Sequence, residues 1–341
     1  MATQTRERTT RTRAKAPPAA RTPADADLPK GGDRTVHRKR LTRHTTAGEA
    51  VLAYLTAQAA LLGALEVAVR QEKPDAVHQM RVTVRRLRST LQAFSGIVSE
   101  QDTSHLRAEL KWCGGVLGGA RDTEVLASQL HAGLAAAPAE LVLGPAQARI
   151  TAHFAPLEAS NRKAVLDAFD SDRYRALRAA LDRLLDDPPL TPKAAEPASA
   201  ALPTAVGRAY RRTRRRMHAA SQAPSGQERD VALHETRKAA KRARYAAEAA
   251  APALGKKSGK KARRFAKRMK KVQSVLGAHQ DAVIAQAAAR DIGVHAHLAG
   301  ENAFSFGLLH EQAHQRALAS EDQVHHVWRR ARRKARWLPQ S

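Results

Sequence analysis

Two short runs of this 341-residue sequence combine one histidine with several basic residues in the same order. The first run begins at His78 and the second at His234, and in each a basic residue stands three, seven, eight and ten positions later. These residues are Arg81, Arg85, Arg86 and Arg88 in the first run and Arg237, Lys241, Arg242 and Arg244 in the second, where Lys238 adds one more. Guanidinium groups donate paired hydrogen bonds to phosphate or carboxylate oxygens, and ammonium groups act as point charges. The runs therefore indicate a site for a multiply charged anion.

Helical spacing places the cations of each run on one stripe. Successive residues of an α-helix are rotated by about 100°, so the residues three, seven and ten positions after the histidine share its side. Apolar residues, such as Met80 and Val84 in the first run and Ala240 and Ala243 in the second, form a narrow face beside the stripe. The basic stripe is thus expected at the edge of the core.

The simplest alternative is a solvated basic face on an amphipathic helix, which is the usual explanation of an isolated charge run. Such a face generally mixes acidic residues among the basic ones and needs no second copy. The stripe positions here hold no acidic residue, and the stripe is found twice. We therefore favour a binding site.

Composition favours an all-α protein that attracts polyanions. No segment alternates with a period of two, and the net charge is +27, from 59 Lys+Arg against 32 Asp+Glu. Residues 1–45 hold twelve of the basic residues, so most of the excess positive charge lies in the part expected to fold. The one cysteine, Cys113, excludes an intrachain disulfide, fits a reducing cytoplasm and is expected in the core.

Neither secretion nor insertion into a membrane is predicted. The N-terminal residues lack the apolar region of a signal peptide. The most apolar stretch, 51–69, is interrupted by Tyr54, Gln58 and Glu66, so it is expected to be a buried bundle helix rather than a membrane anchor. The expected location is the cytoplasm.

The chain divides into a tail and two helical halves. Residues 1–45 carry no apolar period and are predicted to be disordered, either as a polyanion-binding arm or as a solubilising tail. The folded part is expected at 46–338, with a first bundle at 46–189, a linker rich in Pro, Ala and Ser at 190–203, and a second bundle at 204–338.

Helix starts and stops follow from caps, Pro and Gly. The expected helices span 46–71, 74–98, a segment from Ser104, 145–169, 170–185, 204–220, 227–251, a segment to about Arg290 after a basic turn at 252–261, and 301–337. Four glycines between Gly114 and Gly119 predict that the third helix approaches a neighbour closely.

A second pair of similar segments indicates an internal duplication. Residues 110–122 match residues 269–281 at a separation of 159 positions, whereas the two histidines are 156 positions apart. A three-residue difference in one loop accounts for this. The expected fold is all-α and internally duplicated, with two four-helix bundles related by a pseudo-twofold axis that would set the stripes around a cationic groove.

These residues resemble the CHAD family, the conserved-histidine α-helical domain, over about residues 46–338. The resemblance is carried by His78, Arg81, 85–88, 117–118 and 121–122 in the first half and by His234, 237–238, 241–245, 276–277 and Asp281 in the second. It implies two four-helix bundles that bind inorganic polyphosphate, in some members at polyphosphate or polyester storage granules. The Glu-x-Glu-x-Lys signature of the triphosphatase domain fused to some members is absent, so neither hydrolase activity nor a cofactor is expected.

The stripes supply the expected phosphate ligands. Direct ligands are expected to be Arg81, Arg85, Arg88, Arg237, Lys241 and Arg244, outer contacts Arg86, Lys238 and Arg242, and second-rank ligands Lys111, Arg121 and Lys270. For His78 and His234 two roles stay open. Each either contacts phosphate or is a structural residue bonded to a carboxylate such as Asp122 or Asp281.

A His-Glu-x-x-His sequence at 310–314 has the spacing of a zinc protease site. The metzincin continuation is missing, because Ala317 and Ser320 stand where glycine and the third histidine belong. Fifteen histidines make a chance match common, so no metal site is predicted here, although Glu321 and His325 share the approximate face.

A non-catalytic polyphosphate-binding module is the leading hypothesis, and a nucleic-acid-binding protein is the alternative. The chain has 13 aromatic residues, and none lies within the first stripe. Proteins that bind single strands stack bases on aromatic side chains, so this scarcity favours an anion without bases.

Overall fold

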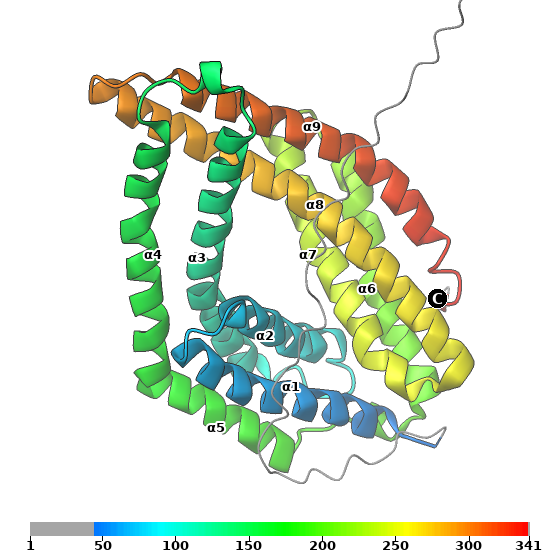
Figure 1. Cartoon of the computed structure of the whole chain (residues 1–341). Coiled ribbons are helices and arrows are strands. Elements are labelled where there is room, and N and C mark those ends of the chain that lie inside the picture. Colours follow the sequence, from blue (N-terminus) through cyan, green and yellow to red (C-terminus); the bar gives the residue numbers. More distant parts are fainter. Residues whose placement is uncertain (1–43, 340–341) are drawn as a thin grey trace, which may run out of the picture. The chain divides into compact units, whose positions relative to one another are not determined.

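The computed structural model describes residues 44–339, and every regular element in that range is helical (Figure 1). The expectation of an all-α fold is confirmed. The nine α-helices of this range are α1 (Ala47–Arg70), α2 (Ala76–Ala93), α3 (Ser104–Ala135), α4 (Ala146–Asp170), α5 (Asp172–Asp186), α6 (Ala198–Gln222), α7 (Gln227–Ala250), α8 (Gly255–Leu298) and α9 (Phe304–Arg332). The tail expected at 1–45 lies almost wholly outside the described residues.

Helix caps define several of these boundaries. The side chain of Thr46 accepts a hydrogen bond from the Glu49 amide, and the Glu49 carboxylate accepts one from the Thr46 amide, so α1 begins with a capping box. Ser171 caps α5 through the amide of Tyr174. Helix α2 ends at Ala93, five residues before the expected end, and a turn follows through Val98.

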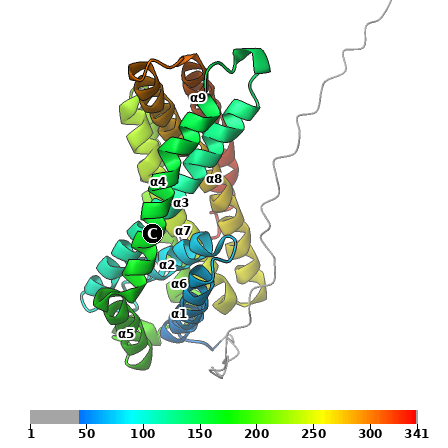
Figure 2. The same ribbon diagram turned by 60° about the vertical axis from the view of Figure 1, so that its left-hand side comes forward.

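Helices that follow one another in the sequence pack against each other in two series, from α1 to α4 and from α6 to α9 (Figures 1 and 2). The contact that matters most for the site joins the two series, because α2 packs directly on α7. These two helices carry the histidine-led stripes.

Buried apolar residues form two clusters, and each draws on both halves of the sequence. The larger cluster takes residues from all nine α-helices of the described range, α1 to α9. The smaller one joins the end of α3 and the start of α4 to α8 and α9, with Leu130, Ile150 and Phe306 among its residues. Cys113 lies in the larger cluster as expected, where burial raises the pKa of its thiol to about 12.

Helix α1 is long and apolar enough to span a membrane by length and composition alone. In this structure Leu55, Leu62 and Leu65 are buried in the larger cluster. This is the packing that the sequence predicts for a bundle helix.

The segment expected as a linker, 190–203, is packed and partly helical. Leu190 pairs with Val98 through an isolated bridge, and Ala194 is buried 3.0 Å from the position that a Cβ on Gly48 would occupy. Helix α6 already begins at Ala198. Alanine has the highest helix propensity, and here it outweighs the proline and serine that suggested a linker.

The turn expected at 252–261 is also shorter than the sequence indicates. Helix α8 begins at Gly255, which has a φ of 65°, and continues to Leu298, eight residues beyond the expected end near Arg290. The close approach that the glycine spacing predicts for α3 is confirmed. A Cβ on Gly114 would lie 3.5 Å from Val84 of α2, and one on Gly119 would lie 2.8 Å from Asn161 of α4.

Two Gly→Ala substitutions distinguish the loss of stability caused by a clash in close packing from the gain caused by a higher helix propensity. A methyl group at Gly259 would lie 2.6 Å from the carbonyl oxygen of Ala251, whereas one at Gly115 would meet no atom within 4 Å in the described chain. We expect Gly259→Ala to lower the free energy of unfolding by about 1–3 kcal/mol and Gly115→Ala to raise it by about 0.5–1 kcal/mol. Urea unfolding followed by circular dichroism measures both, and a stabilising Gly259→Ala would contradict this packing.

Candidate anion-binding site

The packing of α2 on α7 brings the two stripes together. Arg81 and Arg85 from α2 lie close enough to Arg237 and Lys241 from α7 to lower the pKa of both. Asp122 of α3 and Asp281 of α8 complete the group. We call these six residues the central cluster: Arg81, Arg85, Asp122, Arg237, Lys241 and Asp281.

Arg81 is held by Asp122 in a two-pronged ion pair. Its Nη1 donates to Oδ1 of Asp122 at 2.7 Å, and its Nη2 donates to Oδ2 at 3.0 Å. The guanidinium lies over Gly118, where an added Cβ would be 3.6 Å from Nη2. The Asp122 side chain is 69% exposed and that of Arg81 is 21% exposed, so the carboxylate lies on the solvent side of the pair.

Arg237 occupies the equivalent position in the second half but is more enclosed. It lies over Gly277, where an added Cβ would be 3.3 Å from its Nη2. Burial lowers its pKa, with Asp281 opposing and Arg85 adding to the effect. The Nε of Arg237 and that of Arg85 are buried and have no hydrogen-bond partner within residues 44–339. Each leaves a donor that an oxygen anion can satisfy.

Lys241 shows the strongest effect of this environment. Burial, reinforced by Arg237, Arg85 and Arg81, lowers the pKa of its ammonium group to about 7. Asp122 opposes this effect without offsetting it. The four cations of the central cluster face two carboxylates, and burial raises the pKa of one of these, Asp281. An added anion would therefore stabilise the cluster.

The model of the CHAD domain family matches residues 53–290, which contain both stripes and all of the central cluster. The chain belongs to the CHAD domain family. Two uncharacterised proteins of Mycobacterium tuberculosis, one from each of two strains, are 34% identical over 275 residues. These residues make up 79% of this chain and 51% of each relative, so the chain spans about half the length of these relatives.

Solved structures show the same fold. The CHAD domain from the plant Ricinus communis is 26% identical, with a TM-score of 0.66 over 84% of this chain and 93% of that one. PptA from Streptomyces chartreusis is 23% identical, with a TM-score of 0.69 over 84% of this chain and all of the other.

On one flank of the central cluster of this CHAD domain, two arginines that were predicted to bind phosphate instead interact with the carboxylate of Glu248. Arg244 donates to Glu248 at 2.7 Å and to Gln273 at 3.0 Å, and its side chain is 11% exposed. Arg86 approaches the same Glu248 at 3.8 Å and so joins α2 to α7. Arg86 thus supports the contact between α2 and α7, and Arg244 supports the contact between α7 and α8. These contacts leave both arginines less able to bind an added anion.

On the other flank, like charges accumulate. Burial lowers the pKa of Arg88 and of Arg242, with Arg107 adding to the first effect and Arg212 to the second. Arg216 of α6 also acts on Arg242. The sequence did not predict Arg107, Arg212 or Arg216 as residues of the site. A basic run at 211–216 was the available signal, but its position beside α7 depends on helix packing.

The two histidines have equivalent neighbours. His234 Nδ1 lies 2.7 Å from Oε1 of Gln280, and the equivalent residue of the first half, Arg121, lies near His78. Burial lowers the pKa of each imidazole. The carboxylate suggested as a partner of His234 is therefore an amide in this structure. His78 also lines a pocket of about 300 Å³, together with Arg162 of α4.

The remaining predicted ligands lie outside the central cluster. Lys111 and Lys270 are exposed, and neither is among the main causes of the pKa shifts of Arg237, Lys241 and Asp281. Arg121 pairs with Glu124 at 2.6 Å, and Lys238 pairs with Glu235.

The His-Glu-x-x-His sequence does not assemble a metal-ligand group. Within residues 44–339 the group of three ligand atoms close enough to hold a metal ion belongs instead to Asp230, His279 and Glu321. Glu311 accepts a hydrogen bond from Gln315 at 2.7 Å.

Replacing Lys241 by methionine should stabilise the protein. The substitution removes a buried cation from beside three arginines and keeps most of the side-chain volume, so we expect a gain of roughly 1–4 kcal/mol. Because the pKa of Lys241 is about 7 in the fold and 10.5 in its ordinary state, the gain should be largest below pH 7 and shrink as the pH rises toward 10.

Chemical unfolding at several pH values measures this effect, with Lys270→Met as the exposed control that removes the same charge. An equal gain for both variants, or a gain independent of pH, would contradict the burial of a charged Lys241.

Proposed function

We propose that this CHAD domain binds inorganic polyphosphate at the central cluster without acting on it chemically. The proposal rests chiefly on one observation: two helices with apolar contact faces hold Arg81, Arg85, Arg237 and Lys241 together against two carboxylates. Holding this excess of cations together costs free energy unless an anion binds among them. Resemblance to the CHAD family independently implies the same ligand.

The arginines around Arg88 and Arg242, on the second flank of the central cluster, favour a chain of phosphates over a single anion as the ligand. Arg88, Arg212, Arg216 and Arg242 extend the positive charge from the central cluster along α2, α6 and α7. A linear polymer with a negative charge on every unit matches a path of separated cations. Binding of this kind releases counterions and is expected to weaken with salt.

We propose further that the site arose by duplication of one helical unit. Arg81 over Gly118 and Arg237 over Gly277 are equivalent contacts. The expected pseudo-twofold arrangement of two bundles would explain why each half supplies two cations to the central cluster.

Neutralising the central cluster should abolish tight binding. Arg85→Gln combined with Arg237→Gln removes two charge-assisted contacts of about 1.5–3 kcal/mol each, so affinity for long-chain polyphosphate should fall at least about 100-fold. The matched control is Lys111→Gln combined with Lys270→Gln, which removes the same charge from exposed positions. It should change the affinity less than about threefold. Equal losses in the two variants would show that net charge alone drives binding.

Competition with single-stranded DNA at fixed salt distinguishes polyphosphate from the nucleic-acid alternative. Within residues 44–339, Tyr245 is the aromatic residue that lies against a stripe cation, and it is buried, so the stripes offer bases no stacking surface. Both competitors are compared at equal concentrations of phosphate groups. Much less polyphosphate should be needed to displace bound DNA than DNA to displace bound polyphosphate. In cells, we expect a fluorescent fusion at cytoplasmic polyphosphate granules.

Binding should take up a proton near neutral pH. Lys241, with a pKa of about 7, is mostly neutral at pH 8, and a bound phosphate would favour its charged form. Affinity should therefore decrease as the pH rises above 7. Titration calorimetry at pH 8 in two buffers of different ionisation enthalpy measures the uptake, which Lys241→Met should reduce. Unchanged uptake in that variant would remove Lys241 from the site.

A further inference from the structure

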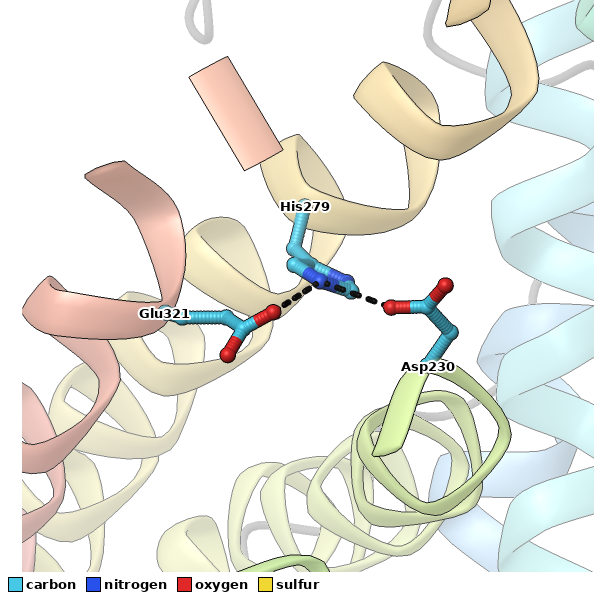
Figure 3. Close-up of side chains that lie close together, drawn as sticks. All are labelled: Asp230, His279 and Glu321. Atoms are coloured by element: carbon cyan, nitrogen blue, oxygen red, sulfur yellow. Dashed lines mark hydrogen bonds and ion pairs between the residues drawn. The ribbon is translucent and has the colours of Figure 1, made fainter. Parts of the chain in front are cut away.

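Three side chains from three helices converge at a point outside the central cluster (Figure 3). Nε2 of His279, on α8, lies 3.2 Å from Oδ1 of Asp230 on α7 and 3.3 Å from Oε1 of Glu321 on α9. One ligand atom from each residue lies within 4.8 Å of the other two. The histidine is 1% exposed, so the imidazole is fixed inside the protein while both carboxylates turn toward it.

A hydrogen bond alone accounts poorly for this arrangement. A neutral imidazole has at most one proton on Nε2, yet two carboxylate oxygens face that nitrogen. Two carboxylates thus surround one buried ring nitrogen. Arg229 lies on the outer side of the group, since its Nη1 is 3.5 Å from the other oxygen of Glu321. A metal ion would add positive charge between the three ligand atoms.

Two of the three distances between the ligand atoms suit a transition-metal ion. Two ligands bonded to zinc at about 2.0–2.1 Å in a tetrahedron are about 3.3 Å apart, which matches both distances from Nε2 of His279. One imidazole with two carboxylates is also a donor set that zinc accepts.

A small pocket adjoins the group at Glu321. It has a volume of about 150 Å³ and is lined by Arg229, Glu321 and His325 among others. His325 follows Glu321 by four residues on the same helix, and this spacing puts both on one side of α9. The pocket thus provides a candidate fourth ligand.

We propose that Asp230, His279 and Glu321 bind a divalent metal ion of the zinc class that fastens α7, α8 and α9 together. The site lies next to the second stripe. His234 follows Asp230 by four residues on α7, and the residue after His279 is Gln280, which is hydrogen-bonded to His234. Bound metal would fix the start of α7 against α8. It would therefore stabilise the helix that presents Arg237 and Lys241.

Zinc titration of the tag-free full chain tests the proposal at pH 7.5. We expect one strong site per chain, with an affinity in the micromolar range or tighter, and an increase in Tm at saturating zinc. Substituting cobalt should give the intense visible absorption of a four-coordinate site. Failure to bind zinc at this level would overturn the proposal.

Two conservative variants locate the site. Glu321→Gln and Asp230→Asn each keep the side-chain shape and should weaken zinc binding by at least about tenfold. The control, His310→Gln combined with His314→Gln, removes the His-Glu-x-x-His alternative and should leave both affinity and the Tm increase unchanged. The opposite pattern, with loss only in the control, would place the metal at 310–314 and refute the assignment. Circular dichroism confirms that each variant is folded before zinc is added.

Discussion

The contact between α2 and α7 is the constraint on which the site depends, because it forces like charges together at the edge of the core. The apolar faces of the two helices are fully buried, with Met80 and Leu87 on one and Ala240 and Ala243 on the other. Burial of such faces provides the main driving force of folding. The free energy gained by this packing offsets the electrostatic repulsion between Arg85 on α2 and the cations Arg237 and Lys241 on α7.

Small residues determine how closely these cations lie to the helices behind them. Gly118 and Gly277 leave room for the guanidinium groups of Arg81 and Arg237 to lie flat on α3 and α8. A larger residue at either position would displace the arginine and alter the central cluster. The glycine, the arginine and the aspartate four residues after the glycine thus form one structural unit in each half.

The sequence was sufficient to predict what depends on helical periodicity. The buried faces of α2 and α7, the position of the basic stripes beside those faces, and the close approach of α3 follow from spacing alone. It was not sufficient for contacts between helices distant in the chain. The pairing of Arg86 with Glu248, and the convergence of Asp230, His279 and Glu321, both depend on how the helices pack.

Local patterns were also misleading where a tertiary contact or propensity outweighed them. The His-Glu-x-x-His sequence has the spacing of a metal site, but the three-ligand group forms elsewhere in the described chain. The segment rich in Pro, Ala and Ser at 190–203 suggested a linker, whereas Ala194 is buried against α1. Conversely, Glu248, four residues after Arg244, could have been recognised from the sequence as its ion-pair partner.

A crystal structure of the full chain with a short polyphosphate tests the central claim most directly. We expect phosphate oxygens within hydrogen-bonding distance of Arg85, Arg237 and Lys241, with further phosphates extending toward Arg88 and Arg242. Phosphate bound only at the exposed basic residues near Lys256 and Lys270, with the central cluster unchanged, would contradict it.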